Sequence, residues 1–223
     1  MQAGSITTHA LSGDGNRVAY ATFGGGLALL DVSAGTTTTI VSEAGFQDLR
    51  PAISDDGTRL AFTSTRNLLG QNADGNAELF LYDVATASLR QLTNTTGGNV
   101  RNSSISGDGR RIAFSTVSDP LGLNGDGNEE VFYYDLDGGL LTQATQTSGS
   151  QLSNFETALS ADGRTLAFTS NRRADGSGNG PAQIFLQDLP PLTQAVPEPP
   201  TLALVAALML AVVWRRRAGT AHG

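Results

Sequence analysis

The sequence contains no cysteine and no lysine, and only two of its 223 residues are histidine. Without cysteine the chain can form neither a disulfide framework nor a thiolate zinc site, and it has no cysteine nucleophile. The histidines, His9 and His222, stand near opposite ends of the chain, so a Ser-His-Asp triad has no suitable base. The sequence also has no Gly-x-Ser-x-Gly elbow and no phosphate loop. We therefore expect that the protein is not an enzyme.

Aromatic residues make up only 6% of the chain and charged residues only 16%, whereas apolar residues reach 39% and glycine numbers 27. This composition is sufficient to bury a core and favours short strands joined by turns. The net charge is −7, and without Glu198 and the three arginines at 215–217 the chain has 20 acidic residues and 11 arginines. An acidic surface repels phosphate groups, so no nucleic-acid partner is expected.

Four segments repeat the pattern Ser-x-Asp-Gly-x-x-apolar-Ala-aromatic. They are SGDGNRVAY from Ser12, SDDGTRLAF from Ser54, SGDGRRIAF from Ser106 and SADGRTLAF from Ser160. Asp-Gly favours a tight turn, because glycine accepts a positive φ and aspartate bonds nearby backbone amides. The apolar and aromatic residues that follow alternate around a small alanine, as in a strand with one buried face. Each segment therefore predicts a hairpin.

A second, mostly apolar block follows in each repeat: LALLDV from Leu27, LFLYDV from Leu79, VFYYDL from Val131 and IFLQDL from Ile184. Such runs are typical of strands covered on both faces, and a Thr-rich piece such as 37–41 suits an outer strand. Four strands per repeat are typical of a propeller blade. We predict an all-β, propeller-type array of four four-stranded blades, forming a closed four-bladed ring or part of a larger ring. The predicted blades are residues 7–42, 48–94, 100–145 and 153–193.

Aromatic residues recur at matching positions of these repeats, and we expect them to pack between blades. They are Tyr20, Phe62, Phe80, Phe114, Phe132, Phe168 and Phe185. The repeats resemble those of TolB-like β-propellers, whose blades open with Ser-Pro-Asp-Gly and continue Ile-Ala-Phe. The resemblance covers residues 7–193 and implies a role as an interaction platform. The proline position is occupied by other residues here, namely Gly13, Asp55, Gly107 and Ala161.

In three repeats the next strand starts 16 or 17 positions after the last aromatic residue of the hairpin, against 7 positions in the first repeat. Insertions at one position of a repeat map to one face, often the binding face. Two of these loops contain alternating oxygen-bearing side chains, at Asn72, Asp74, Asn76 and Glu78 and at Asn124, Asp126, Asn128 and Glu130. A weaker version begins at Asp175.

The sequence favours a loop that caps itself through its Asp-Gly turn and its Asn side chains. The alternative is a calcium site in each loop, because calcium prefers such oxygen ligands, although the EF-hand pattern is not met. Asp126 and Glu130 are also the acidic pair that glycosidase chemistry would use, whereas exposed loop acids are usually just solvated. No cofactor other than calcium is expected.

Proline is frequent after residue 189, and we expect a stiff linker at 194–201. Residues 202–214 carry no charge and precede an arginine cluster at 215–217. Thirteen helical residues cover ~20 Å of the ~30 Å hydrocarbon core, and the interfacial Trp214 and snorkelling arginines extend that reach. We predict a short transmembrane helix at 202–217 and a cytoplasmic tail at 218–223, with the propeller outside.

The order of these parts resembles a PEP-CTERM sorting signal. The residues that carry the resemblance are Val196, Pro197, Glu198 and Pro199 and, after the apolar segment, Arg215, Arg216 and Arg217. This resemblance implies export by a Gram-negative bacterium, recognition by an exosortase-type enzyme with processing near Pro197-Glu198-Pro199, and location at the cell surface or in the extracellular matrix. Residues 1–10 have neither the basic nor the apolar region of a signal peptide, so we expect a longer protein with a leader and earlier blades.

These observations predict an exported, non-enzymatic propeller that acts as a binding or scaffold module. Its partner is expected to be polysaccharide or another envelope protein, bound at the long-loop face. One alternative is a periplasmic TolB-like component of envelope assembly. Another is a propeller-type carbohydrate-active enzyme or the gating propeller of a peptidase.

Overall fold

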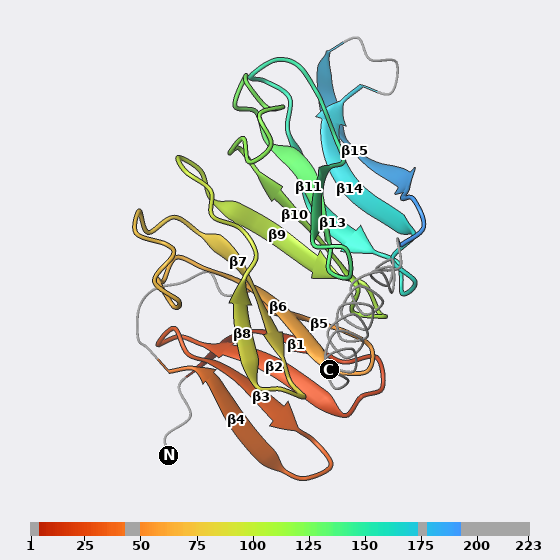
Figure 1. The fold of residues 1–223 in the computed structure, drawn as a ribbon. Helices are drawn as coiled ribbons and strands as arrows, with labels where there is room; N and C mark the ends of the chain where they lie inside the picture. Colours follow the sequence, from red (N-terminus) through yellow and green to blue (C-terminus); the bar gives the residue numbers. More distant parts are fainter. Residues whose placement is uncertain (1–4, 43–49, 174–177, 193–223) are drawn as a thin grey trace, which may run out of the picture. The chain divides into compact units, whose positions relative to one another are not determined.

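The computed structural model describes residues 5–42, 50–173 and 178–192. The chain divides into two compact units, residues 1–191 and 192–223, and every described strand lies in the first. These fifteen strands form four antiparallel sheets that follow one another along the chain, from red to blue in Figure 1. The described part of the chain contains no helix.

Each sheet is a simple meander in which consecutive strands pair, and we call the sheets blades 1 to 4. Blade 1 contains β1 (Ile6–Leu11), β2 (Arg17–Thr22), β3 (Leu27–Asp31) and β4 (Thr36–Val41). Blade 2 contains β5 (Ala52–Ile53), β6 (Arg59–Ser64), β7 (Glu78–Asp83) and β8 (Ser88–Gln91). Blade 3 contains β9 (Val100–Ile105), β10 (Arg111–Thr116), β11 (Glu130–Asp135) and β12 (Leu140–Gln143). Blade 4 contains β13 (Asn154–Leu159), β14 (Thr165–Arg172) and β15 (Asn179–Asp188).

The Ser-x-Asp-Gly segments form the turn between the first two strands of every blade, which confirms the predicted hairpins. In blade 1, Gly15 has a φ of +72°, which favours glycine. The Ser12 hydroxyl donates a hydrogen bond to the Asp14 carboxylate at 2.6 Å. The same serine-to-aspartate bond measures 2.6 to 2.7 Å in the other three blades. The repeated sequence thus builds the same turn four times.

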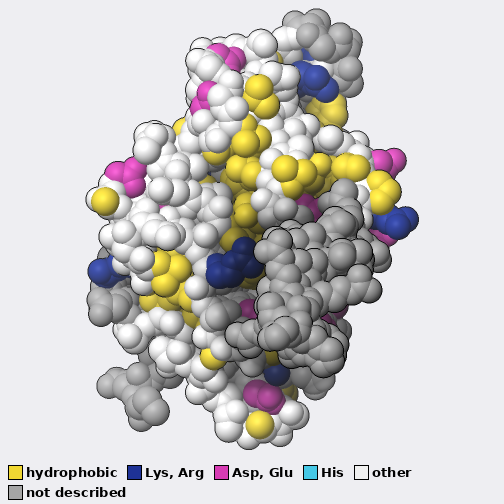
Figure 2. Space-filling model, in the orientation of Figure 1, with side chains coloured by type: hydrophobic (Ala, Val, Ile, Leu, Met, Phe, Trp, Pro, Cys, Tyr) yellow, Lys and Arg dark blue, Asp and Glu magenta, His cyan; other side chains and the backbone are white. Residues whose placement is uncertain are grey.

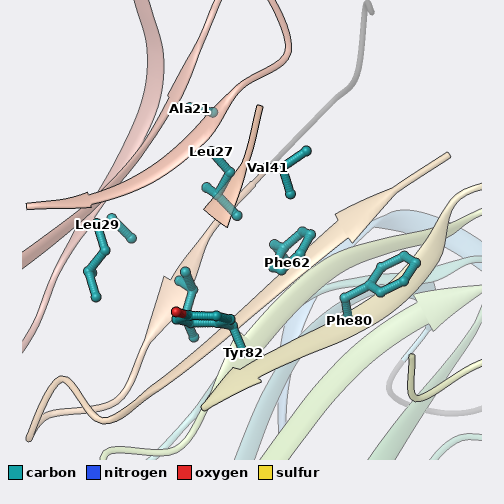
Figure 3. Packing of buried hydrophobic residues seen from close by; sticks show 9 residues of the cluster. Ala21, Leu27, Leu29, Val41, Phe62, Phe80 and Tyr82 are labelled. Atoms are coloured by element: carbon teal, nitrogen blue, oxygen red, sulfur yellow. The ribbon is translucent and has the colours of Figure 1, made fainter. Parts of the chain in front are cut away.

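Hydrophobic side chains pack between consecutive blades. Figure 3 shows the cluster between blades 1 and 2, to which blade 1 contributes Leu27 and Leu29 and blade 2 contributes Phe62, Phe80 and Tyr82. The rings of Phe62 and Phe80 stack with centroids 5.5 Å apart, and the equivalent pairs of blades 3 and 4 stack at 5.7 and 5.8 Å. Two further clusters join blade 2 to blade 3 and blade 3 to blade 4. The six recurring phenylalanines therefore belong to the packing between blades, as their periodicity predicts, whereas Tyr20 is only half-buried and is not part of these clusters.

Blade 4 differs from the others. Its described residues form three strands, so four strands per blade are confirmed only for blades 1 to 3. Ile184 and Leu186 of β15 are 77% and 73% exposed, whereas Leu79 and Leu81 at the same repeat positions are 0% and 4% exposed. Figure 2 shows hydrophobic side chains gathered over β14 and β15. No other described strand covers these two side chains of blade 4.

Backbone hydrogen bonds join neighbouring blades at their Asp-Gly turns. The Asp14 amide donates to the Asp55 carbonyl oxygen at 2.9 Å, and the Asp55 amide donates to the Gly107 carbonyl oxygen at 2.9 Å. The Asp108 amide continues the series to the Ala161 carbonyl oxygen at 2.8 Å. The turns of all four blades are thus connected through the main chain.

Candidate functional site

The first asparagine of each predicted calcium set is buried and holds the backbone of its own loop. Asn72 Nδ2 donates to the carbonyl oxygens of Thr65 at 3.2 Å and Asn76 at 2.8 Å. Asn124 makes the equivalent bond to the Asn128 carbonyl oxygen at 2.9 Å. The Oδ1 atoms of all four asparagines are buried and have no partner among the described atoms. Buried amide oxygens of this kind are usually satisfied by ordered water.

The glutamate of each predicted set is fully buried and contacts the connection to the next blade. Glu78 Oε1 accepts hydrogen bonds from the Thr95 amide at 2.6 Å and the Thr95 hydroxyl at 2.8 Å. Glu78 Oε2 accepts one from the Thr93 hydroxyl. Both carboxylate oxygens are therefore occupied by donors, as a buried charge requires.

Glu130 repeats this arrangement in blade 3. It accepts hydrogen bonds from the Thr145 hydroxyl, from the Thr147 amide and hydroxyl, each at 2.6 Å, and from Asn154 Nδ2 at 2.9 Å. In the sequence, the partners of both glutamates are marked by a Thr-x-Thr pair that follows β8 and again follows β12. The calcium prediction considers only residues within each loop and does not include these threonines. These threonines are the residues that sequence reasoning missed in this region.

The aspartates of the two loops, Asp74 and Asp126, are exposed, whereas the glutamates are buried. Asp126 Oδ2 accepts a hydrogen bond from the Gly149 amide at 2.6 Å. In the described ranges, no group of three or more Asp, Glu or His side chains could hold a metal ion. The hydrogen bonds of the two loops support the self-capping interpretation, and calcium binding stays a prediction. The weaker version at Asp175 lies partly outside the described residues.

Only one member of the acidic pair suggested for glycosidase chemistry is exposed to solvent. Asp126 is exposed, but Glu130 is 0% exposed and hydrogen-bonded through both carboxylate oxygens. A buried carboxylate that stays engaged with three neighbouring side chains cannot protonate a bound sugar. The structure therefore does not support this pair as a catalytic site.

A pocket of about 440 Å³ opens at the loop ends of blades 2 to 4, where β6 ends and β9 and β13 begin. We call it the inner-strand pocket. Its polar and aromatic lining includes Arg50, Asn99, Arg101, Asn102, Glu129 and Phe155. Sequence reasoning missed this pocket, because its residues come from separate blades and meet only when the blades pack side by side.

Glu129 is held in place at the wall of the inner-strand pocket. Its carboxylate accepts hydrogen bonds from the Ser115 hydroxyl at 2.7 Å and the Ser153 hydroxyl at 3.0 Å. Asn102 Nδ2 donates to Ser115 Oγ at 3.2 Å. Arg101 is exposed and makes no ion pair or side-chain hydrogen bond with the described residues. The pocket thus combines fixed polar groups with one uncommitted guanidinium group.

The backbone at the pocket is unusual. Asn102 in β9 has a φ of +52°, and Glu156, at the same repeat position in β13, has a φ of +50°. Both residues lie at irregularities in strand pairing. Asn102 lies where β9 pairs irregularly with Ala113 to Ser115 of β10, and Glu156 lies between Phe155 and Thr157, where the register of β13 with β14 shifts. A bulge in a strand redirects neighbouring side chains, and residues other than glycine adopt such φ values rarely.

The sorting-signal residues lie outside the described part of the chain. They are Val196, Pro197, Glu198, Pro199, Arg215, Arg216 and Arg217, and the predicted helix at 202–217 lies there too. Among the described residues, no helix is long and apolar enough to cross a membrane.

Consecutive antiparallel sheets, each opened by a Ser-x-Asp-Gly hairpin and packed on the next, define a β-propeller repeat protein. The structure is similar to TolB from Acinetobacter baumannii, with a TM-score of 0.56 and 27% identity over 83% of this chain and 41% of that one. A putative TolB from Agrobacterium tumefaciens gives a TM-score of 0.56 and 19% identity over 83% and 58%. The tricorn protease gives a TM-score of 0.53 and 20% identity over 75% and 15%. The chain thus spans less than two thirds of the length of these proteins.

Residues 195–217 match the PEP-CTERM protein-sorting motif. This match and the similarity to TolB propellers confirm both resemblances seen in the sequence. The motif indicates an exported protein that is sorted by exosortase-type machinery in a Gram-negative bacterium and displayed with a membrane anchor. No curated protein matches the sequence significantly.

Proposed function

We propose that this chain is a non-enzymatic binding or scaffold module, displayed at the cell surface or in the extracellular matrix after exosortase-type processing. The observation that carries the proposal is the sorting motif at 195–217, which follows a chain of propeller repeats in the sequence. A rigid array of blades offers a broad surface formed by its loops, and the long loops of blades 2 and 3 lie at the same end of their sheets.

The hydrogen bonding of the acidic residues supports a non-enzymatic role. Glu78 and Glu130 are buried and engaged by threonines, and Glu129 is engaged by two serines. Carboxylates bound in this way stabilise the fold and are not available as a general acid and base pair. Similarity to the tricorn protease, at 20% identity, extends to the fold alone.

In this proposal the segment at 202–217 crosses the inner membrane with Arg215–Arg217 on the cytoplasmic side, as the positive-inside rule requires. The linker at 194–201 then places Pro197-Glu198-Pro199 on the outer side, where a processing enzyme would cut. The propeller is released from the anchor or transferred to a new one at this step. Its partner is polysaccharide or another envelope protein.

The test is the mature C-terminus of the protein made in a bacterium that has an exosortase. We expect mass spectrometry to find a C-terminus near Pro197–Pro199 and fractionation to place the protein at the surface. Replacing Pro197, Glu198 and Pro199 with alanine should leave the full chain in the inner membrane. A chain that still ends at Gly223 and remains in the membrane with the native motif would overturn the proposal.

The second candidate function is a periplasmic component of envelope assembly. It is favoured by the 27% identity to TolB from Acinetobacter baumannii, although this chain covers 41% of that protein. A mature form without an anchor that stays in the periplasm would support this function instead. The same fractionation experiment therefore separates the two.

A further inference from the structure

The lining of the inner-strand pocket varies from blade to blade, whereas the turns and core beside it repeat. Five residues before the serine of each Ser-x-Asp-Gly segment, blade 1 has Thr7, blade 3 has Arg101 and blade 4 has Phe155. The residue that precedes the buried glutamate is Ala77 in blade 2 and Glu129 in blade 3. Since the blades fold alike with different residues at these positions, folding does not require a particular residue type there. Side chains at these positions can therefore contact a ligand.

The pocket presents an uncommitted positive group. Arg101 has no ion pair among the described residues, and the carboxylate of Glu129 already accepts hydrogen bonds from Ser115 and Ser153. A guanidinium group binds a carboxylate through two parallel hydrogen bonds. Arg101 is therefore the group of this pocket that is open to an anionic ligand.

Two asparagines beside Arg101 leave opposite hydrogen-bonding groups open. Asn99 uses Oδ1 to accept from the Ala77 amide at 2.8 Å, which leaves its Nδ2 group without a partner in the described structure. Asn102 uses Nδ2 to donate to Ser115, and its Oδ1 atom has no hydrogen-bond partner among the described residues. One open donor and one open acceptor match the neighbouring hydroxyl groups of a sugar, each of which both donates and accepts.

Phe155 supplies the apolar wall of the pocket. It is half-buried, and it does not belong to the set of aromatic residues that recur for packing between blades. The face of a phenyl ring carries partial negative charge, which suits the polarised C–H groups on the face of a sugar ring. A volume of about 440 Å³ falls within the range of small-ligand pockets.

We propose that the inner-strand pocket binds an acidic saccharide. A uronic-acid carboxylate pairs with Arg101, the hydroxyl groups bond Asn99 and Asn102, and the sugar ring packs on Phe155. This inference rests on the proposed role as a binding module and names the chemistry of its ligand.

The test is a titration of the full chain, purified in detergent micelles, followed by calorimetry and by saturation-transfer NMR of the sugar. The probes are tetragalacturonate, the neutral tetrasaccharide maltotetraose and a tetraglutamate peptide. We expect tetragalacturonate to bind and maltotetraose not to bind. Arg101→Ala should weaken tetragalacturonate binding by about tenfold or more, because it removes a charge-assisted pair.

Arg90→Ala is the matched control, because Arg90 is an exposed arginine of β8 outside this pocket. It should leave the affinity unchanged. Phe155→Ala should also weaken binding, and if it fails to fold, the Arg101→Ala result decides. Equal affinity for the neutral and acidic sugars, no binding of tetragalacturonate, or unchanged affinity in Arg101→Ala would overturn the inference. Tighter binding of tetraglutamate would overturn it in favour of an acidic protein partner.

This experiment is independent of the test of sorting. A protein that is processed and displayed at the surface but does not bind tetragalacturonate would refute the saccharide site alone. A protein that binds tetragalacturonate but is never processed would refute the proposed display and leave the site intact.

Discussion

The carboxylate of Asp55 lies directly against the α-carbon of Gly107 in the next blade, where a β-carbon would overlap Asp55 Oδ2. On its other side, a β-carbon at Gly13 in the preceding blade would come within 2.7 Å of Asp55 Cγ. These residues occupy the position that holds proline in the TolB-like pattern. The side chain of Asp55 in blade 2 thus occupies the space that side chains at Gly13 in blade 1 and Gly107 in blade 3 would need.

Gly107→Ala is expected to destabilise the protein by about 1–3 kcal/mol, because the added methyl group overlaps Asp55 and lies 2.9 Å from the Ala161 α-carbon. Chemical denaturation of the full chain measures the effect. Gly125→Ala is the matched control, since no atom lies within 4 Å of a β-carbon there, and it should change stability by less than about 0.5 kcal/mol.

A double variant separates the two contacts of the new methyl group. Asp55→Ala combined with Gly107→Ala removes the overlapping carboxylate but leaves the contact with the Ala161 backbone, so it should recover part of the lost stability. Equal stability of Gly107→Ala and Gly125→Ala would show that the turns shift apart without cost, contrary to this prediction.

The repeats made most of this fold predictable. The Asp-Gly turns and the apolar periods of two are local signals, and they occur four times in the same order. The complementarity of Asp55 with Gly13 and Gly107 was not predictable in this way, because each residue alone is acceptable in a turn. It becomes visible only when three blades are placed side by side.

The contacts of the candidate sites were also not predictable from local sequence patterns. The predicted calcium ligands are close in sequence, but Glu78 bonds Thr93 and Thr95, which lie 15 and 17 residues away. Glu78 begins β7 and is buried, so its partners are the groups that pack against it in the fold. The spacing of residues within the loop does not predict that burial. Arg101 and Phe155 of the inner-strand pocket are likewise far apart in sequence and come from different blades.

Arg111 is expected to be the arginine whose loss destabilises the array most. Its side chain is 1% exposed and donates to the carbonyl oxygens of Gly163 at 2.8 Å and Pro190 at 2.6 Å. It also lies 3.5 Å from the carboxylate of Asp135, which is buried. Arg111→Ala leaves that carboxylate unpaired, so we expect a loss of about 3–5 kcal/mol by chemical denaturation.

Arg17 provides the comparison, because it occupies the same repeat position in blade 1. It donates to the Gly57 carbonyl oxygen at 2.9 Å but is only half-buried. Arg17→Ala should therefore cost about 1 kcal/mol, the usual net value of one hydrogen bond. If the two variants lose the same free energy, burial of Arg111 is not what makes its contacts important.

Calcium is expected to leave the thermal midpoint of unfolding unchanged. Glu78 and Glu130 already accept hydrogen bonds at both oxygens, and the asparagine oxygens buried in the loops are neutral. A ligand specific to the native state raises the midpoint. Scanning calorimetry with added calcium and then with a chelator measures this. A midpoint that rises with calcium and falls with chelator would contradict this prediction and show that the native protein binds calcium.

Asp162 is expected to titrate below the usual range of an aspartate. The Ser160 hydroxyl donates to its carboxylate at 2.7 Å and the Arg164 amide donates at 3.0 Å, and these bonds lower the pKa of Asp162. Because the folded pKa lies below the unfolded one, the contribution to stability is present above the unfolded pKa and is lost as pH falls through the folded pKa. NMR titration of the carboxyl carbon measures this pKa directly.

Ser160→Ala should raise the pKa of Asp162 toward its ordinary value, since the serine hydroxyl is the largest cause of the shift. Ser33→Ala is the matched control at Asp31, whose pKa is lowered first by the Ala34 amide and only second by the Ser33 hydroxyl. We therefore expect a smaller change at Asp31 than at Asp162. An unchanged pKa of Asp162 in Ser160→Ala would show that the serine hydroxyl does not stabilise the charged carboxylate. The backbone amide of Arg164 would then be the donor that lowers this pKa.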